Sequence, residues 1–566
     1  MLAPLFVLLI STLTFFRRID AFPLRNWDEA WYAEIIKNMA SGQFSLLAPY
    51  WNGQYYFDKP PLYFWLTLPI VRLFGPGEWQ MRVASVSASV LATLLVYLIG
   101  KRLFDKTTGL ISSVVFLTLG QVVIRFAHGN LDALLVCFIL LTFYLFLLSE
   151  KRPFFLVLSG ISLGFVILTK GPLLALFPIL WIIILFRAKN SGILGPQSSP
   201  DSTRTASSAY AGDVANFEAR KREPRPQECG NLLLFERSGA KSRTSRFSGF
   251  AGLTRRIFEV MAFALLSSGW WLALGTLRFG KDFVNWYVLN PSGNLLTHPL
   301  SSFSLSYFQD LLRDIGFWFI LVGIFLALKV KVPKNTKQIL ISFLTITFIF
   351  TFYLNFLSEK LGWYNLPAYP LVALIIGYLT SQTLPKKTKL TMALLTLIIP
   401  LQIINAIRIE NIYPDRSRVG AQLGQRAKNL IPKEDTIILD DRDFPSFLYY
   451  SEHKEIFVVT AQGPKPSEWW ILNYADLPKF LKDVSICHSE RSEESFDFAQ
   501  DKSRSFVESG STQDDKKCTD IGSNTWIITP NIKNLPPEAQ SGQIIDQFQG
   551  YKFLKINSYG NLALQD

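Results

Sequence analysis

The sequence predicts a polytopic α-helical membrane protein that ends in a small α/β domain. Of its 566 residues, 49% are hydrophobic and only 18% are charged. Apolar runs of about 20 residues, the length of a membrane-crossing helix, recur through residues 1–407. Beyond residue 408 the apolar runs are short and are separated by turn residues. We therefore expect a membrane domain over 1–407 and a domain on the outer face over 408–566.

The membrane domain is predicted to contain about eleven transmembrane helices. The apolar segments cover residues 1–16, 83–100, 108–125, 131–149, 154–169, 172–186, 257–277, 315–330, 338–357, 366–383 and 390–407. The first segment has neither a positive n-region nor an A-x-A-like cleavage site. We therefore expect it to be an uncleaved span rather than a signal peptide.

Lysine and arginine set the predicted orientation, because cytoplasmic loops carry an excess of both. Counting spans puts the basic loops on one face, which we assign as cytoplasmic: 101–106, 151–152, 189–256, 329–337 and 386–389. The outer face then receives 17–80, 278–313, 358–365 and everything after about 408. Arg17 and Arg18 oppose the rule, but they lie in a long loop, where the charge bias is weaker.

The tail contains the pattern of a small α/β domain. Its predicted strands are Thr436–Leu439, Ile456–Val459 and Trp526–Ile528, and a helical pattern covers 419–430. Two polar stretches interrupt these predicted domains, at about 190–250 in the membrane domain and 487–518 in the C-terminal domain. The first is rich in Ser, Arg, Gly and Pro without helical or strand periodicity and is expected to be disordered. Both are expected to be insertions in loops, and neither is assigned a function.

Composition also excludes some partners. The four cysteines show no CxxC spacing and no nearby histidine cluster, which excludes a zinc ribbon or a disulfide framework. The net charge of +13 is explained by membrane topology and anionic lipid. No nucleic-acid partner is therefore expected.

Ionisable groups gather beside aromatic residues in the predicted outer loops. Their positions are Asp28, Glu29, Glu34, Asp58 and Lys59 in the first loop, Asp132 and Lys170 at span ends, Trp286, Tyr287, Asn290, Asn294 and His298 in the next loop, and Lys360, Trp363 and Tyr364 in the last. A carboxylate can take a proton from a hydroxyl or hold a metal, and a lysine can neutralise a phosphate. This set suits transfer of a sugar from a phosphate leaving group.

The order of the motifs resembles the ArnT-like, PMT_2-type polyprenyl-phosphate glycosyltransferases of the GT-C fold. The matching segments are Asp28-Glu29-Ala30-Trp31-Tyr32-Ala33-Glu34, Phe57-Asp58-Lys59-Pro60-Pro61-Leu62, Leu131-Asp132, Thr169-Lys170-Gly171-Pro172, and Ser358 to Pro370 with Lys360, Tyr364 and Pro367. The resemblance covers about residues 20–385. It implies an inverting transferase, for a hexose or a pentose, in the bacterial inner membrane. The donor would be a sugar on undecaprenyl phosphate, used at the periplasmic face.

The resemblance also assigns roles to single residues. Asp28 matches the acidic catalytic position in the family's first loop. Asp58 and Lys59 match its F-E-K-P-P pair, with Asp in place of Glu. Lys59, Lys170 and Lys360 are expected to bind the donor phosphate, and Asp58, Asp132 and Tyr364 the substrate. Asp58 and His298 are candidate ligands of a divalent metal, although an arginine expected shortly after the histidine is absent.

Each of these residues also has a purely structural interpretation. Asp28 and Glu29 could cap an interfacial helix over about 29–40; we favour catalysis for Asp28 and capping for Glu29. Asp132 could serve only as a structural partner of Arg125 or His128, and the choice between this role and a functional one stays open. The remaining alternatives are a solvated loop position for His298, interfacial anchoring for Lys59 and Lys170, and an aromatic belt for Trp363 and Tyr364. Arg82 is a reserve candidate for the phosphate.

Two functions from different classes fit the pattern. The first is sugar transfer from a polyprenyl-phosphate donor to a lipid or protein acceptor, a choice left open because protein O-mannosyltransferases share the acidic first loop. The second is transport or flipping of a lipid-linked saccharide. Transporters usually have internal repeats with broken helices in matching halves. We find no such repeat, and the acids cluster in a loop rather than at mid-span, so we favour the transferase.

Overall fold

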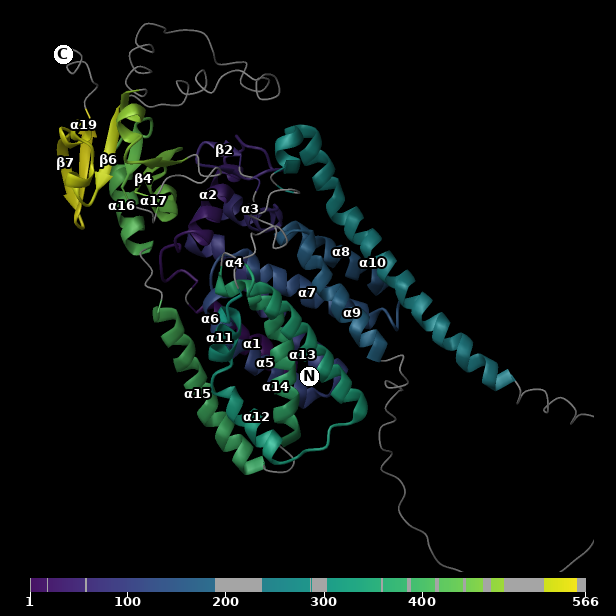
Figure 1. Ribbon diagram of the computed structural model, residues 1–566. Coiled ribbons are helices and arrows are strands. Elements are labelled where there is room, and N and C mark those ends of the chain that lie inside the picture. The colour runs from purple at the N-terminus through teal and green to yellow at the C-terminus, as the bar shows by residue number, and fades with distance from the viewer. Residues whose placement is uncertain are drawn as a thin grey trace, which may run out of the picture.

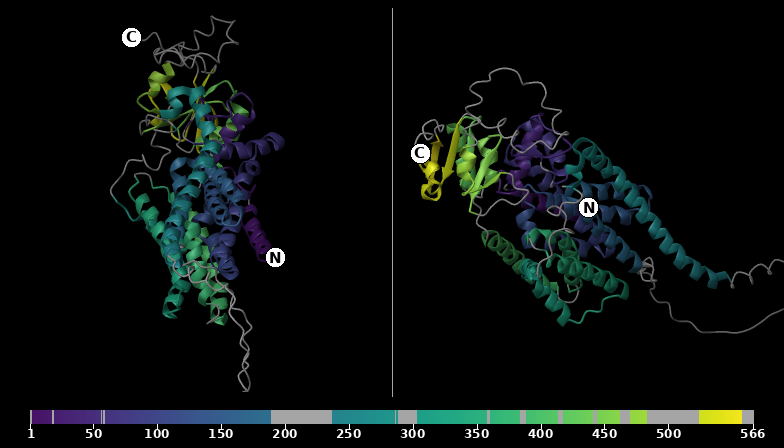
Figure 2. Two further views of the ribbon diagram at one scale, coloured as in Figure 1. Left: turned by 90° about the vertical axis from the view of Figure 1, so that its right-hand side faces the viewer. Right: turned by 45° about the horizontal axis from the view of Figure 1, so that its top comes forward.

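A helical bundle with a β-sheet at one end makes up the protein (Figure 1). The computed structural model describes residues 2–17, 19–55, 57, 59–188, 237–285, 287, 303–357, 360–383, 388–412, 417–440, 444–461, 470–482 and 524–556. The sheet lies beside the elements of the first loop, at the end of the bundle opposite to α12 (Figures 1 and 2).

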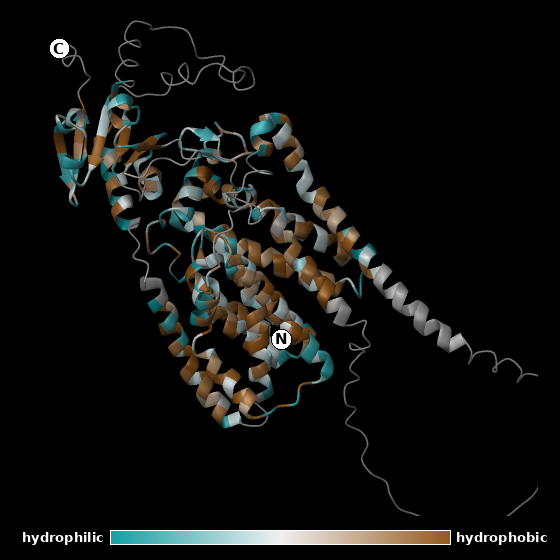
Figure 3. Cartoon of the chain, in the orientation of Figure 1, coloured by the Kyte–Doolittle hydropathy of each residue, from teal (hydrophilic) through white to brown (hydrophobic). Residues whose placement is uncertain are grey.

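The bundle consists mainly of apolar helices. Its elements are α1 (Leu2–Phe16), α3 (Leu62–Phe74), α4 (Glu78–Leu103), α5 (Lys106–Thr118), α6 (Gly120–Arg125), α7 (Leu131–Leu148), α8 (Phe154–Lys170), η1 (Pro172–Ala175), α9 (Leu176–Ala188), α10 (Arg237–Val284), α11 (Ser306–Ile315), α12 (Trp318–Ala327), α13 (Lys334–Leu354), η5 (Gly362–Ala368), α14 (Tyr369–Thr383) and α15 (Thr388–Ile412). Hydrophobic residues dominate most of these helices, whereas polar residues collect around the first loop and the sheet (Figure 3).

Among the described residues, five helices are long and apolar enough to cross a membrane. These stretches are Glu78–Leu103, Leu131–Leu148, Gly252–Val284, Lys334–Leu354 and Thr388–Arg408. Helices α1, α3, α8 and α12 are apolar but shorter. The polytopic helical architecture agrees with the sequence, while the number of about eleven spans stays a prediction.

Three elements differ from what the sequence predicts. The segment 108–125 forms two helices, because Leu119 leaves the helical region at ψ 134°. Helix α3 was not predicted, since its 13 residues fall short of a span. Helix α10 begins at Arg237, so the end of the 190–250 stretch is helical rather than disordered. Extending an existing helix costs far less than starting one. Residues 189–236 and 483–523 lie outside the described residues.

Glycines let neighbouring helices approach closely, as is common between membrane helices. A Cβ at Gly109 of α5 would lie 2.5 Å from the carbonyl oxygen of Tyr97 on α4. A Cβ at Gly164 of α8 would lie 2.8 Å from the carbonyl oxygen of Ala264 on α10. These contacts fix α4, α5, α8 and α10 against one another at backbone distance.

The C-terminal sheet has six strands in the order β5-β4-β3-β6-β8-β7. Strands β3 (Thr436–Leu439), β4 (Ile456–Thr460), β5 (Ile471–Asn473) and β6 (Thr525–Thr529) are parallel, and β7 (Gln543–Phe548) and β8 (Tyr551–Ile556) add an antiparallel hairpin at one edge. The accompanying helices are α16 (Ser417–Leu430), α17 (Phe444–Ser451), η6 (Ile532–Asn534) and α19 (Pro537–Gln540). Strands β3, β4 and β6 coincide with the three predicted strand segments.

The first loop is folded onto this sheet. It contains α2 (Asp28–Ala40), the interfacial helix expected from the sequence, and a hairpin of β1 (Tyr50–Trp51) and β2 (Gln54–Tyr55). Alternating residues of β3 and β6 share one hydrophobic core with the first loop, including Ile437, Ile528, Ala30, Ile35 and Trp51. The residues on the other sheet face form a separate cluster under η6 and α19. The first loop and the C-terminal sheet therefore form one packed layer above the bundle.

Candidate functional site

A four-residue ion-pair cluster lies where α2 meets the ends of α6, α7 and α8. The Arg125 guanidinium contacts Asp28 at 2.6 Å and Asp132 at 2.9 Å. The Lys170 ammonium contacts the other oxygen of Asp132 at 2.5 Å. These side chains come from four different helices, so tertiary folding alone brings them together. We call this set the Arg125 cluster.

Each member of the cluster sits at a helix end. Asp28 is the first residue of α2, Arg125 the last of α6, and Lys170 the last of α8. Asp132 follows Asn130, whose side chain caps α7 by accepting from the backbone N–H groups of Asp132 and Ala133. Carboxylates at helix N-termini and cations at helix C-termini are both favoured by the helix dipole.

Exposure separates the two carboxylates. The side chain of Asp28 is 33% exposed, whereas that of Asp132 is 4% exposed. Arg125 is flanked by both acids, whose negative charges favour its protonated form. The cation therefore stays charged and holds both acids. Asp28 is the carboxylate that a substrate can reach.

Aromatic rings from η5 cover the two cations. The Arg125 guanidinium lies 4.1 Å from the ring centre of Trp363, and the Lys170 ammonium lies 5.0 Å from that of Tyr364. Such cation–π contacts stabilise partly desolvated charges. Lys360, two residues before η5, donates to the carbonyl oxygen of Asn355 at 3.3 Å. The segment 360–364 thus adds two rings to the cluster's border, and its Lys360 ammonium is held by Asn355.

A second ion pair lies beneath the site and is completely buried. Arg82 donates to the two carboxylate oxygens of Glu29 at 2.6 and 2.9 Å, and its remaining N–H groups donate to the carbonyl oxygens of Ile19, Phe22 and Pro23. Glu29 also accepts from the backbone N–H groups of Arg25 and Gly129. Burial raises the pKa of Glu29, but Arg82 outweighs it and the pKa falls to about 2.

This pair corrects two interpretations from the sequence. Glu29 is not the capping residue of α2: the N-cap position is Trp27, and the carboxylate of Glu29 points into the buried pair. Arg82 does not suit a donor phosphate, because it is 1% exposed and its donors are already used by Glu29 and by carbonyl oxygens. Glu34 is likewise structural, since it is buried and contacts Lys37 at 2.5 Å.

Asp132 pairs with Arg125, one of the two partners expected from the sequence, and also with Lys170, while its substrate-binding role stays a prediction. Burial, together with nearby Arg25, lowers the pKa of His128 to about 3, so its ring stays neutral.

Lys59 lies just before α3 and is partly buried. Tyr287 is buried, and its hydroxyl donates to the carbonyl oxygen of Ile167 at 3.4 Å. Residues Asp58, Trp286, Asn290, Asn294 and His298 lie outside the described residues.

The described side chains do not fit a metal ion. Within the described ranges, no three His, Cys, Asp or Glu side chains come together. Asp28 and Asp132 are instead held by Arg125 and Lys170. The two candidate ligands from the sequence, Asp58 and His298, are both among the residues not described.

The sequence did not single out Arg125 as a site residue. It was considered only as a partner of Asp132, and its contact with Asp28 spans 97 positions of the chain. The one available signal is an arginine placed before a His-Gly-Asn turn and the Leu-Asp motif. An aromatic belt was the structural alternative for Trp363, and the structure places this ring over Arg125.

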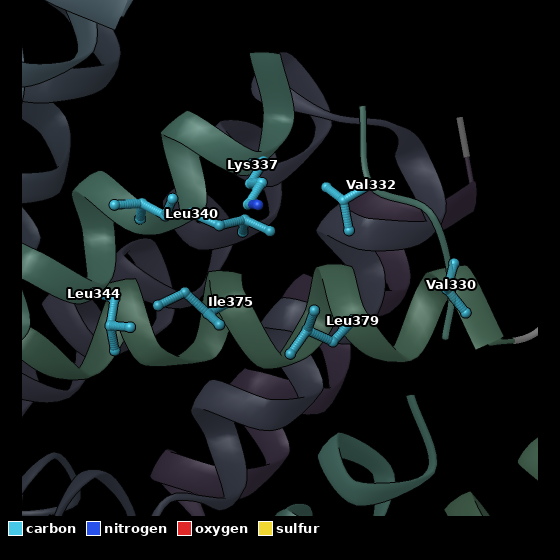
Figure 4. A pocket seen from close by; sticks show the side chains of 8 residues that line it. Val330, Val332, Lys337, Leu340, Leu344, Ile375 and Leu379 are labelled. Atoms are coloured by element: carbon cyan, nitrogen blue, oxygen red, sulfur yellow. The ribbon is translucent and has the colours of Figure 1, made fainter. Parts of the chain in front are cut away.

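An apolar cavity elsewhere in the bundle is separate from the Arg125 cluster. It has a volume of 420 Å³ and lies between α13, α14 and the turn before α13 (Figure 4). Val330, Leu344, Ile375 and Leu379 are among its lining residues, and Lys337 supplies its charge. It shares no residue with the cluster and offers no carboxylate for chemistry.

Known proteins resemble this chain in both sequence and fold. The family model described as dolichyl-phosphate-mannose-protein mannosyltransferase (PMT_2) matches residues 58–194. An uncharacterized protein of Aquifex aeolicus is 24% identical over 375 residues, which are 65% of this chain and 62% of that protein. An undecaprenyl phosphate-alpha-4-amino-4-deoxy-L-arabinose arabinosyl transferase of Pseudomonas aeruginosa (strain UCBPP-PA14) is 31% identical over 160 residues, which are 27% of this chain and 29% of that protein. Both matches cover less than two thirds of the relative's length.

The similarity in fold extends over nearly the whole chain. ArnT from Cupriavidus metallidurans in the apo state matches with a TM-score of 0.64 at 13% identity, covering 98% of both chains. The same protein bound to undecaprenyl phosphate matches with a TM-score of 0.60, again over 98% of both chains.

The architecture is therefore that of the GT-C fold. Within this class the chain resembles ArnT, in fold over nearly its whole length and in sequence over a part of it, and residues 58–194 match the PMT_2 model, as the order of its motifs predicted.

Proposed function

We propose that this chain is a membrane glycosyltransferase that moves a sugar from a polyprenyl-phosphate donor to an acceptor at the outer face of the bacterial inner membrane. The observation that carries the proposal is the position of Asp28. It is a partly exposed carboxylate fixed at 2.6 Å from Arg125, beside a group of cations and rings. The arabinosyl transferase relatives support a polyprenyl-phosphate sugar as the donor.

The charges in the cluster match the proposed reaction. The acceptor hydroxyl or amine forms a bond to the anomeric carbon while the bond from that carbon to the phosphate oxygen breaks. The leaving polyprenyl phosphate takes the electron pair, and Asp28 takes the acceptor's proton. A single displacement of this kind inverts the anomeric centre. Preorganised cations stabilise the negative charge that develops on the phosphate.

The other members of the cluster hold this arrangement. Arg125 fixes the orientation of Asp28, and Asp132 keeps Arg125 and Lys170 in place from below. We assign the donor phosphate to Lys170 and Lys360, together with Lys59. We assign the sugar to Tyr364, and the support for this assignment is its ring, which lies 5.0 Å from the Lys170 ammonium. Asp58 was given a substrate-binding role from the sequence, which stays a prediction.

Replacement of Asp28 by Asn tests the proposal. Asn keeps the size of the side chain but cannot take a proton, so transfer should fall by about 10²–10⁴. Purified full-length protein would be assayed with a polyprenyl-phosphate sugar and membrane glycolipids, with product measured by mass spectrometry. Donor binding and thermal unfolding should change little.

Asp20→Asn is the matched control, because Asp20 is an exposed acid of the same loop. Asp20→Asn should transfer at the wild-type rate. Wild-type transfer by Asp28→Asn would refute the role of Asp28. If the wild-type protein forms no glycosidic product but moves a lipid-linked saccharide across vesicles, the transporter is the correct function.

A further inference from the structure

Trp27 is an exposed tryptophan directly before Asp28 in the chain. Its side chain is 45% exposed. Its ring is stacked on Trp31 with centres 6.3 Å apart, and Trp31 is stacked on Trp51 at 4.0 Å. Trp470, just before β5, meets the rings of both Trp31 and Trp51 edge-on. A continuous aromatic stack thus runs from Asp28 to the C-terminal sheet, and Trp27 is its exposed end.

The backbone at Trp27 is strained. Its φ of 65° and ψ of −115° lie in a region that residues other than glycine rarely adopt. The neighbours fix this conformation: Asn26 accepts from the backbone N–H of Ser446, and Trp31 donates its backbone N–H to the carbonyl oxygen of Trp27. Strain of this kind is found mainly at ligand-binding and catalytic positions. A glycine would adopt this backbone conformation with less strain. The presence of a tryptophan side chain at this position therefore indicates a role for its ring.

We propose that Trp27 is a stacking platform for a sugar ring of the acceptor, so that the acceptor is a glycolipid or glycan rather than a peptide. This inference rests on the proposed transferase function. The face of an indole ring is negative and attracts the weakly positive C–H groups of a sugar face. Trp is also a large, rigid surface that loses little conformational entropy on binding.

The position of Trp27 assigns it to the acceptor rather than to the donor. Arg125, Lys170 and Tyr364 lie on the bundle side of Asp28, where the donor phosphate is expected. The Trp27 stack extends on the other side, toward the sheet. The acceptor hydroxyl must reach both Asp28 and the anomeric carbon of the donor. An acceptor sugar ring stacked on Trp27 would place this hydroxyl between the Trp27 stack and the donor-binding residues.

Binding of defined probes to the full-length protein in detergent tests the proposal. The probes are an acylated glucosamine disaccharide (lipid A), phosphatidylglycerol and a Ser/Thr-containing peptide. Trp27→Leu should weaken binding of the disaccharide lipid about tenfold, since an aromatic contact contributes up to about 1.5 kcal/mol and 1.4 kcal/mol is a factor of ten. Trp27→Phe should retain most of the affinity, and phosphatidylglycerol binding should not change.

Two further variants separate binding from structure. Trp270 on α10 is also 45% exposed and stacks on Trp65, so Trp270→Leu is the matched control for an interfacial tryptophan and should bind the disaccharide lipid normally. Trp27→Gly removes the ring and relieves the backbone strain. This variant should therefore unfold at a higher temperature than Trp27→Leu, and its affinity for the disaccharide lipid should be as low as that of Trp27→Leu. A purely structural Trp27 would make binding follow thermal stability across these variants.

Unchanged disaccharide binding by Trp27→Leu and Trp27→Gly would overturn the proposal, as would an equal effect of Trp270→Leu. Peptide binding that depends on Trp27, with none of the disaccharide lipid, would also overturn it and indicate a protein acceptor. These outcomes do not depend on the chemistry at Asp28. Failure of the proposed function would instead appear as normal transfer by Asp28→Asn with binding at Trp27 intact.

Discussion

At the residue scale, the buried pair of Glu29 and Arg82 holds the start of α2 beneath the candidate site. Glu29 is adjacent to Asp28, and its carboxylate joins α2, the preceding loop and the turn at Gly129 through ion pairs and backbone N–H groups. Removing one member of a buried pair leaves an uncompensated charge, which typically costs about 3–5 kcal/mol. The pair therefore determines where Asp28 stands, although neither member touches the exposed site.

Glu29→Gln is expected to lower the stability at pH 7 by about 3–5 kcal/mol, because Arg82 loses its counter-charge in the interior. Thermal unfolding in detergent measures this. The control is Glu150→Gln, since Glu150 lies 3.9 Å from Arg102 in a partly exposed pair. That pair should contribute less than about 1 kcal/mol. Equal effects of the two substitutions would show that the Glu29 pair is not structurally important.

The same pair gives a pH dependence. The pKa of Glu29 falls from its ordinary 4.5 to about 2 in the folded protein. A lowered carboxyl pKa adds stability that is fully present above the ordinary pKa and disappears as the pH falls toward the folded value. The difference in unfolding temperature between wild type and Glu29→Gln should therefore shrink between pH 4.5 and pH 2. A constant difference across this range would contradict the ionised pair.

Lys360 and Lys59 are expected to offset the charge of the donor phosphate. Replacing either by Met keeps the length of the side chain and removes the cation. Each substitution should weaken binding of polyprenyl phosphate, measured in detergent, while the unfolding temperature stays near that of wild type. Lys533→Met, in η6 of the sheet region, is the control and should bind normally. If both variants bind as wild type does, the phosphate lies nearer to Lys170.

At the element scale, the β1–β2 hairpin connects the first loop to the C-terminal sheet. Asn52 and Gly53 have φ values of 44° and 85° and form its two-residue turn. Asn-Gly is the preferred pair when both turn residues need positive φ. The Asn52 side chain donates to the carbonyl oxygen of Ile456 at 3.0 Å and accepts from its N–H at 2.9 Å. The hairpin thus holds the first residue of β4.

Asn52→Ala should loosen this junction, because it removes two buried hydrogen bonds and leaves the backbone groups of Ile456 without these partners. The expected cost is about 1–3 kcal/mol for each unsatisfied group. Hydrogen exchange should accelerate in β4 and in the first loop and remain unchanged in the α7–α8 pair. Asn38→Ala is a control, since Asn38 bonds Tyr50 within the first loop and not the sheet. Slow exchange in β4 of Asn52→Ala would contradict the coupling.

Sequence patterns identified the elements that have a clear period or motif. Buried strands β3, β4 and β6 are short apolar runs between turns, and α2 follows the acidic motif, so local signals were sufficient. Helix α3 was missed because 13 apolar residues are too few for a span and too many for a buried strand. Arg125 and Trp27 were missed for another reason: their roles depend on contacts with α2, α7 and Trp31 that no local pattern records. Asp28, Asp132, Lys170 and Tyr364 were found through motifs; the first three belong to the Arg125 cluster, and Tyr364 covers its Lys170.

At the scale of the whole molecule, the contact between the first loop and the sheet limits the topology. Tyr450 of α17 donates to Glu78 at the start of α4 and accepts from the backbone N–H of Leu24. Two parts of the chain that touch in water must lie on the same side of the membrane. The number of crossings between residues 40 and 417 must then be even. The sequence predicts ten segments between residues 83 and 407, which is an even number.

The side on which this shared layer lies is the last prediction. The lysine and arginine residues of the loops at 101–106 and 329–337 predict a cytoplasmic position for these loops, so the first loop and the sheet should face outward. A reporter enzyme active only outside the cytoplasm, fused after Ile412 at the end of α15, should be active. The same reporter fused after Leu103, at the end of α4, should be inactive. The reverse pattern would move Asp28 and the Arg125 cluster to the cytoplasmic face, where a donor flipped outward cannot reach them. Activity of both fusions would instead put Leu103 and Ile412 on the same side of the membrane. The crossing by α4 would then separate Glu78 from Tyr450, and the contact of Tyr450 with Glu78 and Leu24 would have to be wrong.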